Sequence, residues 1–146
     1  MKHHVIVRVI AKLVIPGIIL FALYVQFHGD YGPGGGFQAG IIFASAFILY
    51  GLVFGVDKVR QVAPPWILTS LVAIGLMLFT GVGIAAMVFG GNFLEYAVFF
   101  EHDFAESQKL GILLVELGVG ITVAAVMMTV FFLFAGRIER DAEPGS

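Results

Sequence analysis

The chain reads His28-Gly29-Asp30-Tyr31-Gly32-Pro33-Gly34-Gly35-Gly36-Phe37 between two apolar segments that are each long enough to cross a lipid bilayer. Five glycines and one proline among positions 28–36 prevent a helix, because glycine leaves the backbone unrestricted and proline removes an amide donor. The stretch therefore predicts a tight turn. Such a turn brings two spanning helices back side by side as a hairpin, and its amides and carbonyls can face water, an ion or another subunit.

The composition indicates an integral membrane protein. Hydrophobic residues make up 60% of the 146 residues, charged residues make up 12%, and the mean hydropathy is +1.01. An ordinary soluble domain carries about 25% charged residues. The net charge of −2 argues against nucleic acid as a partner. The chain has no cysteine, which excludes disulfides, thiolate catalysis and cysteine-ligated metals.

Four apolar runs approach or exceed the roughly 20 residues that cross a hydrocarbon core. They predict an all-α fold with a four-helix transmembrane domain over residues 1–136, and the spans cover about 9–27, 37–56, 66–90 and 110–134. The first run has no small-residue cleavage site, so we interpret it as a span and not as a signal peptide. Residues 137–146 are predicted to be a polar cytoplasmic tail, disordered from Glu139 onward.

The distribution of basic residues predicts the orientation, since Lys and Arg are retained in short cytoplasmic segments. Lys109 stands alone on one side of the predicted spans, and seven basic residues lie on the other: Lys2, Arg8, Lys12, Lys58, Arg60, Arg137 and Arg140. Both termini are therefore predicted to be cytoplasmic. The turn at 28–36 and the acidic, aromatic connector at 91–109 then lie outside, and we expect the connector to lie along the membrane interface or on a neighbouring subunit.

Glu116 is the one acidic residue within a predicted span, six residues into the helix expected from Leu110. An acid at a helix centre costs about 2.5 to 3.5 kcal/mol on insertion scales, although this depth is only about 9 Å below the outer boundary. Two interpretations stay open. Glu116 is a proton or cation relay that faces a hydrated path or a partner, or it is a structural acid bonded to a neighbouring helix.

The glycines have two further interpretations. The order from Gly34 to Ala39 fits a dinucleotide fingerprint, with Asp57 near the distance of a ribose ligand, but that fingerprint requires a preceding strand and a soluble βαβ unit. We therefore reject nucleotide binding. Helix packing explains the glycines better, because small residues recur along the second span and permit close backbone approach by a neighbour: Gly36, Gly40, Ala44, Gly51 and Gly55.

Histidine and hydroxyl residues give weaker signals. His28 and Asp30 could meet His102 and Asp103 in a surface metal site, but no ligand spacing enforces this, so we predict no metal site. His28 and Asp30 are more simply expected to bond the backbone of the turn or to form a titratable pair near an ion entrance. The hydroxyls are expected to bond their own helices: Thr69, Thr80, Thr122 and Thr129.

Two motifs resemble a known family. The first motif has the order H-G-x-x-x-P-G-G-G-F-x-x-G. The second is an acidic residue followed by Gly-Val in the last span, here Glu116 to Val119. Both are similar to motifs of the B subunit of Mrp-type multisubunit cation/proton antiporters, the MnhB family. The resemblance covers nearly the whole chain. Asp30 departs from the family, which often has histidine or another residue there, so no proton role is assigned to it. The motif of the outer turn comprises His28, Gly29, Asp30, Pro33, Gly34, Gly35, Gly36, Phe37 and Gly40.

The resemblance implies a small, non-catalytic subunit of an assembly in a bacterial or archaeal inner membrane that exchanges Na⁺ for H⁺. The implied partners are the large antiporter-like subunits A and D and the small subunits C, E, F and G, with no cofactor and no catalytic residue in this chain. Glu116 is the candidate residue of an ion path. The alternative is a purely structural scaffold of a related complex, such as a membrane-bound hydrogenase. A small membrane enzyme is disfavoured, because the chain lacks a nucleophile with a nearby base.

Overall fold

The structure is a computed structural model that describes residues 2–29, 34–96 and 104–142, with side chains described for residues 4–29, 34–96 and 105–138. Within these ranges the chain forms helices and no strand. The helices are α1 (Lys2–Phe27), α2 (Gly36–Phe54), α3 (Val56–Val62), α4 (Pro65–Val88) and α5 (Phe104–Ala142).

Four of the described helices are long and apolar enough to cross a membrane. These segments have mean hydropathies of 2.0 to 2.4, and they cover His4–Phe27, Gly36–Phe54, Pro65–Val88 and Ala105–Ile138. At about 1.5 Å per residue, even the 19-residue segment in α2 reaches about 28 Å, close to the thickness of a hydrocarbon core. The prediction of an all-α protein with four membrane-length helices is confirmed.

Glycine and proline set the helix ends. Gly35 precedes α2 with φ at 148°, and Gly55 follows α2 with φ at 106°, a region that residues with a side chain rarely adopt. α4 begins at Pro65, because proline at the first position of a helix loses no backbone hydrogen bond.

The connector after α2 contains a helix that the sequence analysis missed. α3 is seven residues long, with Asp57 in its first turn and Arg60 in its last turn. This placement complements the helix dipole at both ends, and the two side chains also form an exposed ion pair at 3.8 Å. Val59 of α3 is fully buried, so the short helix packs back against the bundle.

α5 is longer than its apolar run. It begins at Phe104, six residues before the expected start at Leu110, and continues to Ala142. Glu116 therefore lies twelve residues, or about 18 Å, from the start of the helix instead of six. The expected disorder from Glu139 onward is wrong for residues 139–142, which are helical; residues 143–146 lie outside the described part of the chain.

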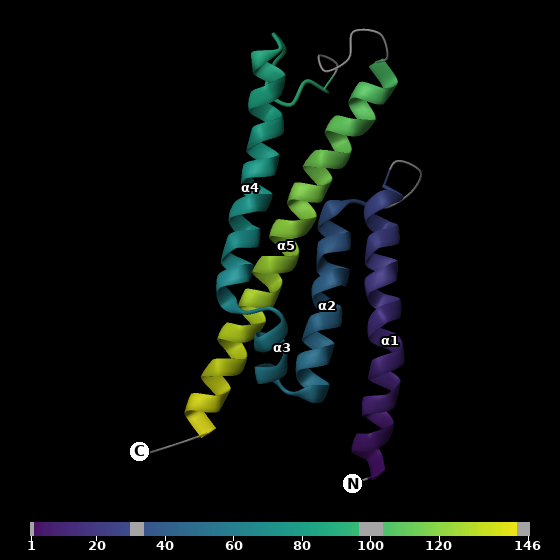
Figure 1. Cartoon of the computed structure of the whole chain (residues 1–146), viewed down its shortest axis with the longest axis vertical. Coiled ribbons are helices and arrows are strands. Elements are labelled where there is room, and N and C mark those ends of the chain that lie inside the picture. Colours follow the sequence, from purple (N-terminus) through teal and green to yellow (C-terminus); the bar gives the residue numbers. More distant parts are fainter. Residues whose placement is uncertain (1, 30–33, 97–103, 143–146) are drawn as a thin grey trace.

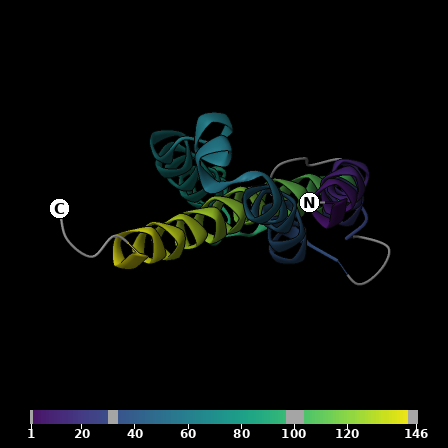
Figure 2. The ribbon, with the colours of Figure 1, turned by 90° about the horizontal axis from the view of Figure 1, so that it is seen from below.

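The helices form a row in which α5 holds a central place. α5 packs against α4 on one side and α2 on the other, and α1 packs against α2. Figure 1 shows α5 crossing the bundle at a tilt between α4 and α2, and Figure 2 shows α1 and α4 at opposite sides of the row. The α1–α2 pair ends well short of the end of the bundle where α4 approaches the start of α5 (Figure 1).

Small residues allow the helices of this row to approach closely. In α2 the buried positions are Gly36, Ala39, Gly40, Ala44, Ala46 and Gly51. A Cβ atom added to Gly40 would lie 2.7 Å from the carbonyl oxygen of Gly120 in α5. The packing interpretation of these glycines is confirmed, except at Gly55, which is exposed and has no neighbour within 4 Å of an added Cβ. Three of the threonines, Thr69, Thr122 and Thr129, bond their own helix backbone as expected.

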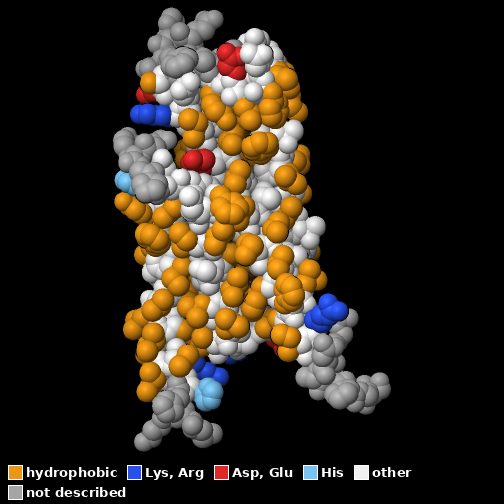
Figure 3. Space-filling model, turned by 180° about the vertical axis from the view of Figure 1, so that it is seen from behind, with side chains coloured by type: hydrophobic (Ala, Val, Ile, Leu, Met, Phe, Trp, Pro, Cys, Tyr) orange, Lys and Arg blue, Asp and Glu red, His pale blue; other side chains and the backbone are white. Residues whose placement is uncertain are grey.

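The surface of the long helices is apolar. Large hydrophobic side chains such as Leu13, Leu52, Trp66, Met77 and Leu133 are each at least 69% exposed. Figure 3 shows hydrophobic side chains along the length of one face, with Lys and Arg gathered toward the ends of the long axis. Such a surface suits lipid or other membrane subunits, and the chain is a multi-pass membrane protein.

Candidate functional site

Glu116 is enclosed by the glycines that flank the α1–α2 connection. A Cβ atom added to Gly29 would lie 3.1 Å from Oε2 of Glu116, and one added to Gly35 would lie 3.3 Å from Oε1. A side chain at either glycine would therefore meet the carboxylate, and the absence of a Cβ atom leaves room for it. Two features that lie about eighty residues apart in the sequence form one site, which we call the Glu116 cradle: Gly29, Gly35, Gly36 and Glu116.

The backbone of Gly36 lies against the backbone of α5. A Cβ atom at Gly36 would overlap the carbonyl oxygen of Glu116 and would lie 2.7 Å from its carbonyl carbon. A Cβ atom at Gly120, one turn further along α5, would lie 3.1 Å from the carbonyl oxygen of Gly36. The start of α2 is thus fixed on the same turn of α5 that carries the carboxylate, and any side chain at Gly36 would separate the helices.

The carboxylate lies at the N-terminus of α2. Gly35 occupies the position before the first residue of this 19-residue helix, and its backbone is beside Oε1 of Glu116. The amides at a helix N-terminus have no partner within the helix, and the helix dipole there favours a negative charge. The carboxylate therefore lies near the positive end of the α2 dipole.

The cradle lies roughly halfway along α4. Gly118, two residues after Glu116, packs so closely on α4 that an added Cβ would lie 2.9 Å from the carbonyl oxygen of Gly75 and 3.2 Å from the amide nitrogen of Phe79. Both contacts fall near the middle of α4, which runs from Pro65 to Val88. The ends of α1 and α2 therefore meet α5 in the interior of the bundle's length, in agreement with Figure 1.

The other residues of the predicted turn motif divide between the cradle and the surface. His28 is half-buried, and its ring stacks on Tyr24 with centroids 4.8 Å apart. Gly34 packs on α1, where an added Cβ would lie 3.1 Å from the carbonyl oxygen of Val25. Phe37 is 59% exposed, so it faces lipid or a partner. Asp30 and Pro33 lie outside the described residues.

Gln26 is a polar residue of the site that the sequence analysis missed. It is only 6% exposed, its Oε1 lies 2.7 Å from the position of an added Cβ on Gly120, and its Nε2 has no hydrogen-bond partner among the described residues. The signal was present in the sequence, because Gln26 lies three residues before Gly29 and is the only amide in the apolar run of α1. A search for polar residues one turn from the glycine stretch would have found it.

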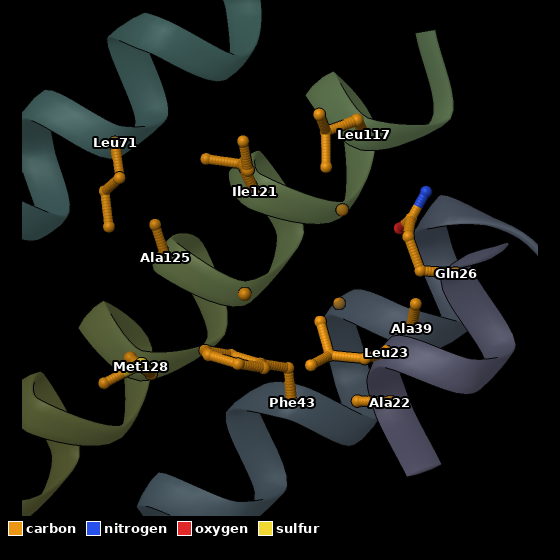
Figure 4. A pocket seen from close by; sticks show the side chains of 13 residues that line it. Ala22, Leu23, Gln26, Ala39, Phe43, Leu71, Leu117, Ile121, Ala125 and Met128 are labelled. Carbon is orange, nitrogen blue, oxygen red and sulfur yellow. The ribbon is translucent and has the colours of Figure 1, made fainter. Parts of the chain in front are cut away.

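A pocket of about 270 Å³ lies near the cradle and is lined by residues of α1, α2 and α5 and by Leu71 of α4. Gln26 lies at one end, near Leu117 and Ala39, and the other labelled side chains in Figure 4 consist of carbon, apart from the sulfur of Met128. Along α5 the pocket runs from Leu117 to Met128, which is about 16 Å of helix. It is an apolar groove with one polar residue at the end nearest Glu116.

The rest of the chain shows no competing site among the residues that can be described. No group of three or more metal-binding side chains occurs in the described ranges, and Asp30, His102 and Asp103 lie outside them. Asp57 lies at the far end of α2 from the glycine stretch, separated from it by about 28 Å of helix, and the described residues before the glycines form helix α1 and no strand. The rejection of a dinucleotide site agrees with this geometry.

The described part of the α4–α5 connector folds back on its own chain. The ring of Phe93 lies where a Cβ at Gly83 would be, and that of Tyr96 lies where a Cβ at Gly111 would be. The Ser107 hydroxyl donates a hydrogen bond to the carbonyl oxygen of Tyr96. Burial raises the pKa of the Tyr96 phenol above its ordinary value. These two aromatic rings of the connector contact α4 and α5, and Phe93 also remains 47% exposed.

Comparison with known proteins agrees with this architecture. Residues 6–129 match the family described as a domain related to the MnhB subunit of a Na⁺/H⁺ antiporter. A protein of Staphylococcus haemolyticus (strain JCSC1435), provisionally named antiporter subunit mnhB2, is 34% identical over 137 residues, covering 92% of this chain and 96% of the relative. The protein of the same name from Staphylococcus aureus (strain Newman) has the same identity and coverage. The chain belongs to the MnhB family.

Proposed function

We propose that this chain is a non-catalytic subunit of a multisubunit Na⁺/H⁺ antiporter and that Glu116 belongs to a path for protons or sodium ions. The family and the names of its relatives support the antiporter assignment. The observation that carries the role of Glu116 is its carboxylate, held between the backbones of Gly29 and Gly35 at the N-terminus of α2. An acidic residue within a membrane-spanning helix most often marks an ion or proton pathway.

The charged residues suggest how the chain lies in the bilayer. Arg8, Lys12 and Arg60 lie toward one end of the helices, and Lys109 lies near the start of α5 at the other. With Lys109 at the outer boundary and both termini cytoplasmic, Glu116 lies seven residues, or about 10 Å, inside the apolar layer. The described ends of the predicted outer turn, Gly29 and Gly35, then lie at the depth of Glu116.

The non-helical residues at this depth must be shielded from lipid. Non-helical backbone within the hydrocarbon layer is stable only where protein buries it or where it lines a water-filled cavity. The chain is too small to enclose this region alone and offers few polar ligands for a complete route. We therefore propose that other antiporter subunits, the large ones A and D and the small ones C, E, F and G, cover the cradle and supply the remaining path.

The test is the variant Glu116→Gln in the intact complex. We expect Na⁺-dependent proton exchange in inside-out vesicles to fall about tenfold or more, because the amide cannot carry a proton or a negative charge, and one hydrogen bond to a charged group corresponds to a factor of that order. The matched control is Glu106→Gln, the same change at an exposed position of the same helix, which should leave exchange unchanged. Purification through a tag on this chain measures assembly.

A structural scaffold is the second candidate, favoured by the close backbone contact between Gly36 and Glu116. In that case Glu116→Gln leaves exchange normal, or abolishes it only where the companion subunits are lost as well. Normal exchange by an assembled Glu116→Gln complex would therefore exclude the path and leave the scaffold.

A further inference from the structure

We propose that a groove between α1, α2 and α3 binds one anionic phospholipid of the cytoplasmic leaflet. In this proposal an acyl chain of the lipid lies in the groove, and its phosphate lies at Lys12 and Lys58. The groove is at the end of the bundle where both termini lie (Figure 1), away from Glu116. The lipid site is therefore independent of the role proposed for that carboxylate.

The α1–α2–α3 groove is apolar and has a volume of about 180 Å³. Six side chains from the three helices line it: Ile15, Ile19, Ala46, Phe47, Tyr50 and Val62. Ala46 is fully buried and Val62 is 62% exposed, so the groove is closed at α2 and open toward the outside of the bundle. Its volume is about six times the roughly 30 Å³ of one water molecule in the liquid, which leaves room for a short run of methylene groups.

The groove lies near the cytoplasmic boundary of the hydrocarbon layer. Gly29 and Gly36 both lie against Glu116. Ile15 precedes Gly29 by fourteen residues, or about 21 Å of helix, and Tyr50 follows Gly36 by the same number. In the orientation proposed above, Glu116 is about 10 Å inside the outer boundary, so this end of the groove is about 31 Å from that boundary. A hydrocarbon core is about 30 Å thick, and the lipid headgroups therefore begin where the groove ends.

A lysine lies one helical turn from the groove on each of two helices. Lys12 precedes Ile15 by three residues on α1, and Lys58 precedes Val62 by four residues on α3. Side chains at these spacings are neighbours on the surface of a helix. Both lysines are exposed, and neither has an ion-pair partner among the described residues. Basic sites between membrane helices on the cytoplasmic side attract the headgroups of anionic lipids.

The lining and the charges favour a lipid over a helix of another subunit. Membrane helices that pack closely meet at small residues, but five of the six side chains that line the groove are large. A flexible acyl chain can follow such a lining. An uncharged lipid would leave the two ammonium groups without a counter-charge, whereas a phosphate without a compensating cation in its headgroup supplies one. The occupant that satisfies both features is an anionic phospholipid.

The test is photolabelling of the intact complex in phosphatidylcholine vesicles that contain a trace of phosphatidylglycerol with a diazirine on its acyl chain. We expect the label on peptides of this chain that contain Ile15, Ile19 or Tyr50. A phosphatidylcholine probe with the same acyl chain should label these peptides about tenfold less or weaker still, because two lysines near the membrane surface each contribute a factor of about five.

Variants separate charge from packing. Lys12→Gln and Lys58→Gln should each reduce labelling by the phosphatidylglycerol probe about fivefold, and Lys12→Arg and Lys58→Arg should retain it. The matched control is Lys109→Gln, the same change at an exposed position near the other end of the bundle, which should leave labelling unchanged. Purification through a tag on this chain measures the assembly of each variant.

Three results would overturn the lipid site. Equal labelling by the two probes shows that the groove holds lipid without recognising its charge. Unchanged labelling of an assembled double variant, Lys12→Gln with Lys58→Gln, removes the lysines from the site. Absence of label from the groove peptides in the wild-type complex shows that another subunit covers the groove. The probe comparison on the wild-type complex decides the case even where a variant does not assemble, and none of these results bears on Glu116.

Discussion

Gln26 and Glu116 are polar residues of the described chain that lie among apolar helices. Glu116 is half-buried beside Gly29 and Gly35, at the N-terminus of α2. Gln26 is almost fully buried beside a pocket, and its amide nitrogen has no partner among the described residues. Both lie where α1, α2 and α5 converge, and this makes that point the functional candidate of the molecule.

Gly36→Ala tests how closely α2 must approach α5. The added methyl group would overlap the backbone carbonyl of Glu116, which cannot rotate away, so we expect a loss of stability of about 3 kcal/mol or more. The measurement is the midpoint temperature at which the purified complex is lost from its size-exclusion peak.

The control for that change is Gly81→Ala in α4, where nothing lies within 4 Å of an added Cβ. Alanine is the better helix former by roughly 0.5–1 kcal/mol, so the midpoint should hold or rise. Equal midpoints for the Gly36→Ala and wild-type complexes would show that the contact between α2 and α5 is looser than described.

At the residue scale, the sequence predicted Glu116 and the glycine stretch as separate features. Their contact could not be predicted, because it depends on how far α1 and α2 reach along α5, and nothing local encodes that distance. Gln26 was missed because the sequence analysis considered acids and histidines near the glycine stretch and not the single amide one turn before it.

The pairing of α4 with α5 depends on small residues at the crossing. A Cβ at Gly75 would overlap the hydroxyl of Thr122 and would lie 2.7 Å from the carbonyl oxygen of Gly118. A Cβ at Gly83 would overlap only the ring of Phe93, a side chain in the connector after α4. The first contact involves the backbone of a helix, and the second involves a side chain that can turn.

We therefore expect Gly75→Ala to lower the stability of the complex by about 2 kcal/mol or more, and Gly83→Ala to lower it less. Adding Thr122→Ala should restore only part of the loss at Gly75, because the carbonyl of Gly118 remains. Thermal midpoints of the three complexes measure this. Full recovery in the double variant would mean that the hydroxyl, and not the backbone, limits the approach.

The elements themselves were largely predictable. Four long apolar runs gave four membrane-length helices, since a hydrocarbon layer imposes both length and composition. α3 was missed because it is only seven residues long and mostly polar. Burial of Val59 in the bundle holds it in place. The extension of α5 beyond its apolar run was missed for a similar reason, since its polar first and last turns carry no hydropathy signal.

The whole molecule is a row of helices with apolar faces left exposed, which suits a subunit that other membrane proteins cover. Its orientation in the membrane is testable because the chain has no cysteine, so a single introduced cysteine can be labelled without background from the chain itself. We expect Asn92→Cys to react with an impermeant maleimide added outside intact cells, and Ser146→Cys to react only after the cells are opened. The variants are read on the band of this chain after purification.

Two results would contradict the predicted orientation: labelling of Ser146→Cys from outside, or protection of Asn92→Cys until lysis. The recessed position of the cradle on the outer side would then be wrong. The contact of Glu116 with Gly29 and Gly35 would stand, because it does not depend on which side of the membrane is which.

The sequence by itself determined that this chain is a membrane protein, that it has four segments long and apolar enough to cross the bilayer, and that it carries an acid in the last of its predicted spans and a glycine-rich connection of the MnhB kind. Those properties follow from composition and local backbone freedom, which are written residue by residue. Only the tertiary structure decided that Gly29 and Gly35 lie beside the acid, that Gln26 lies about one turn further along α5, at Gly120, and that this region lies halfway along α4. Such placement comes from the register between helices, which is set by backbone contacts between glycines distant in the chain.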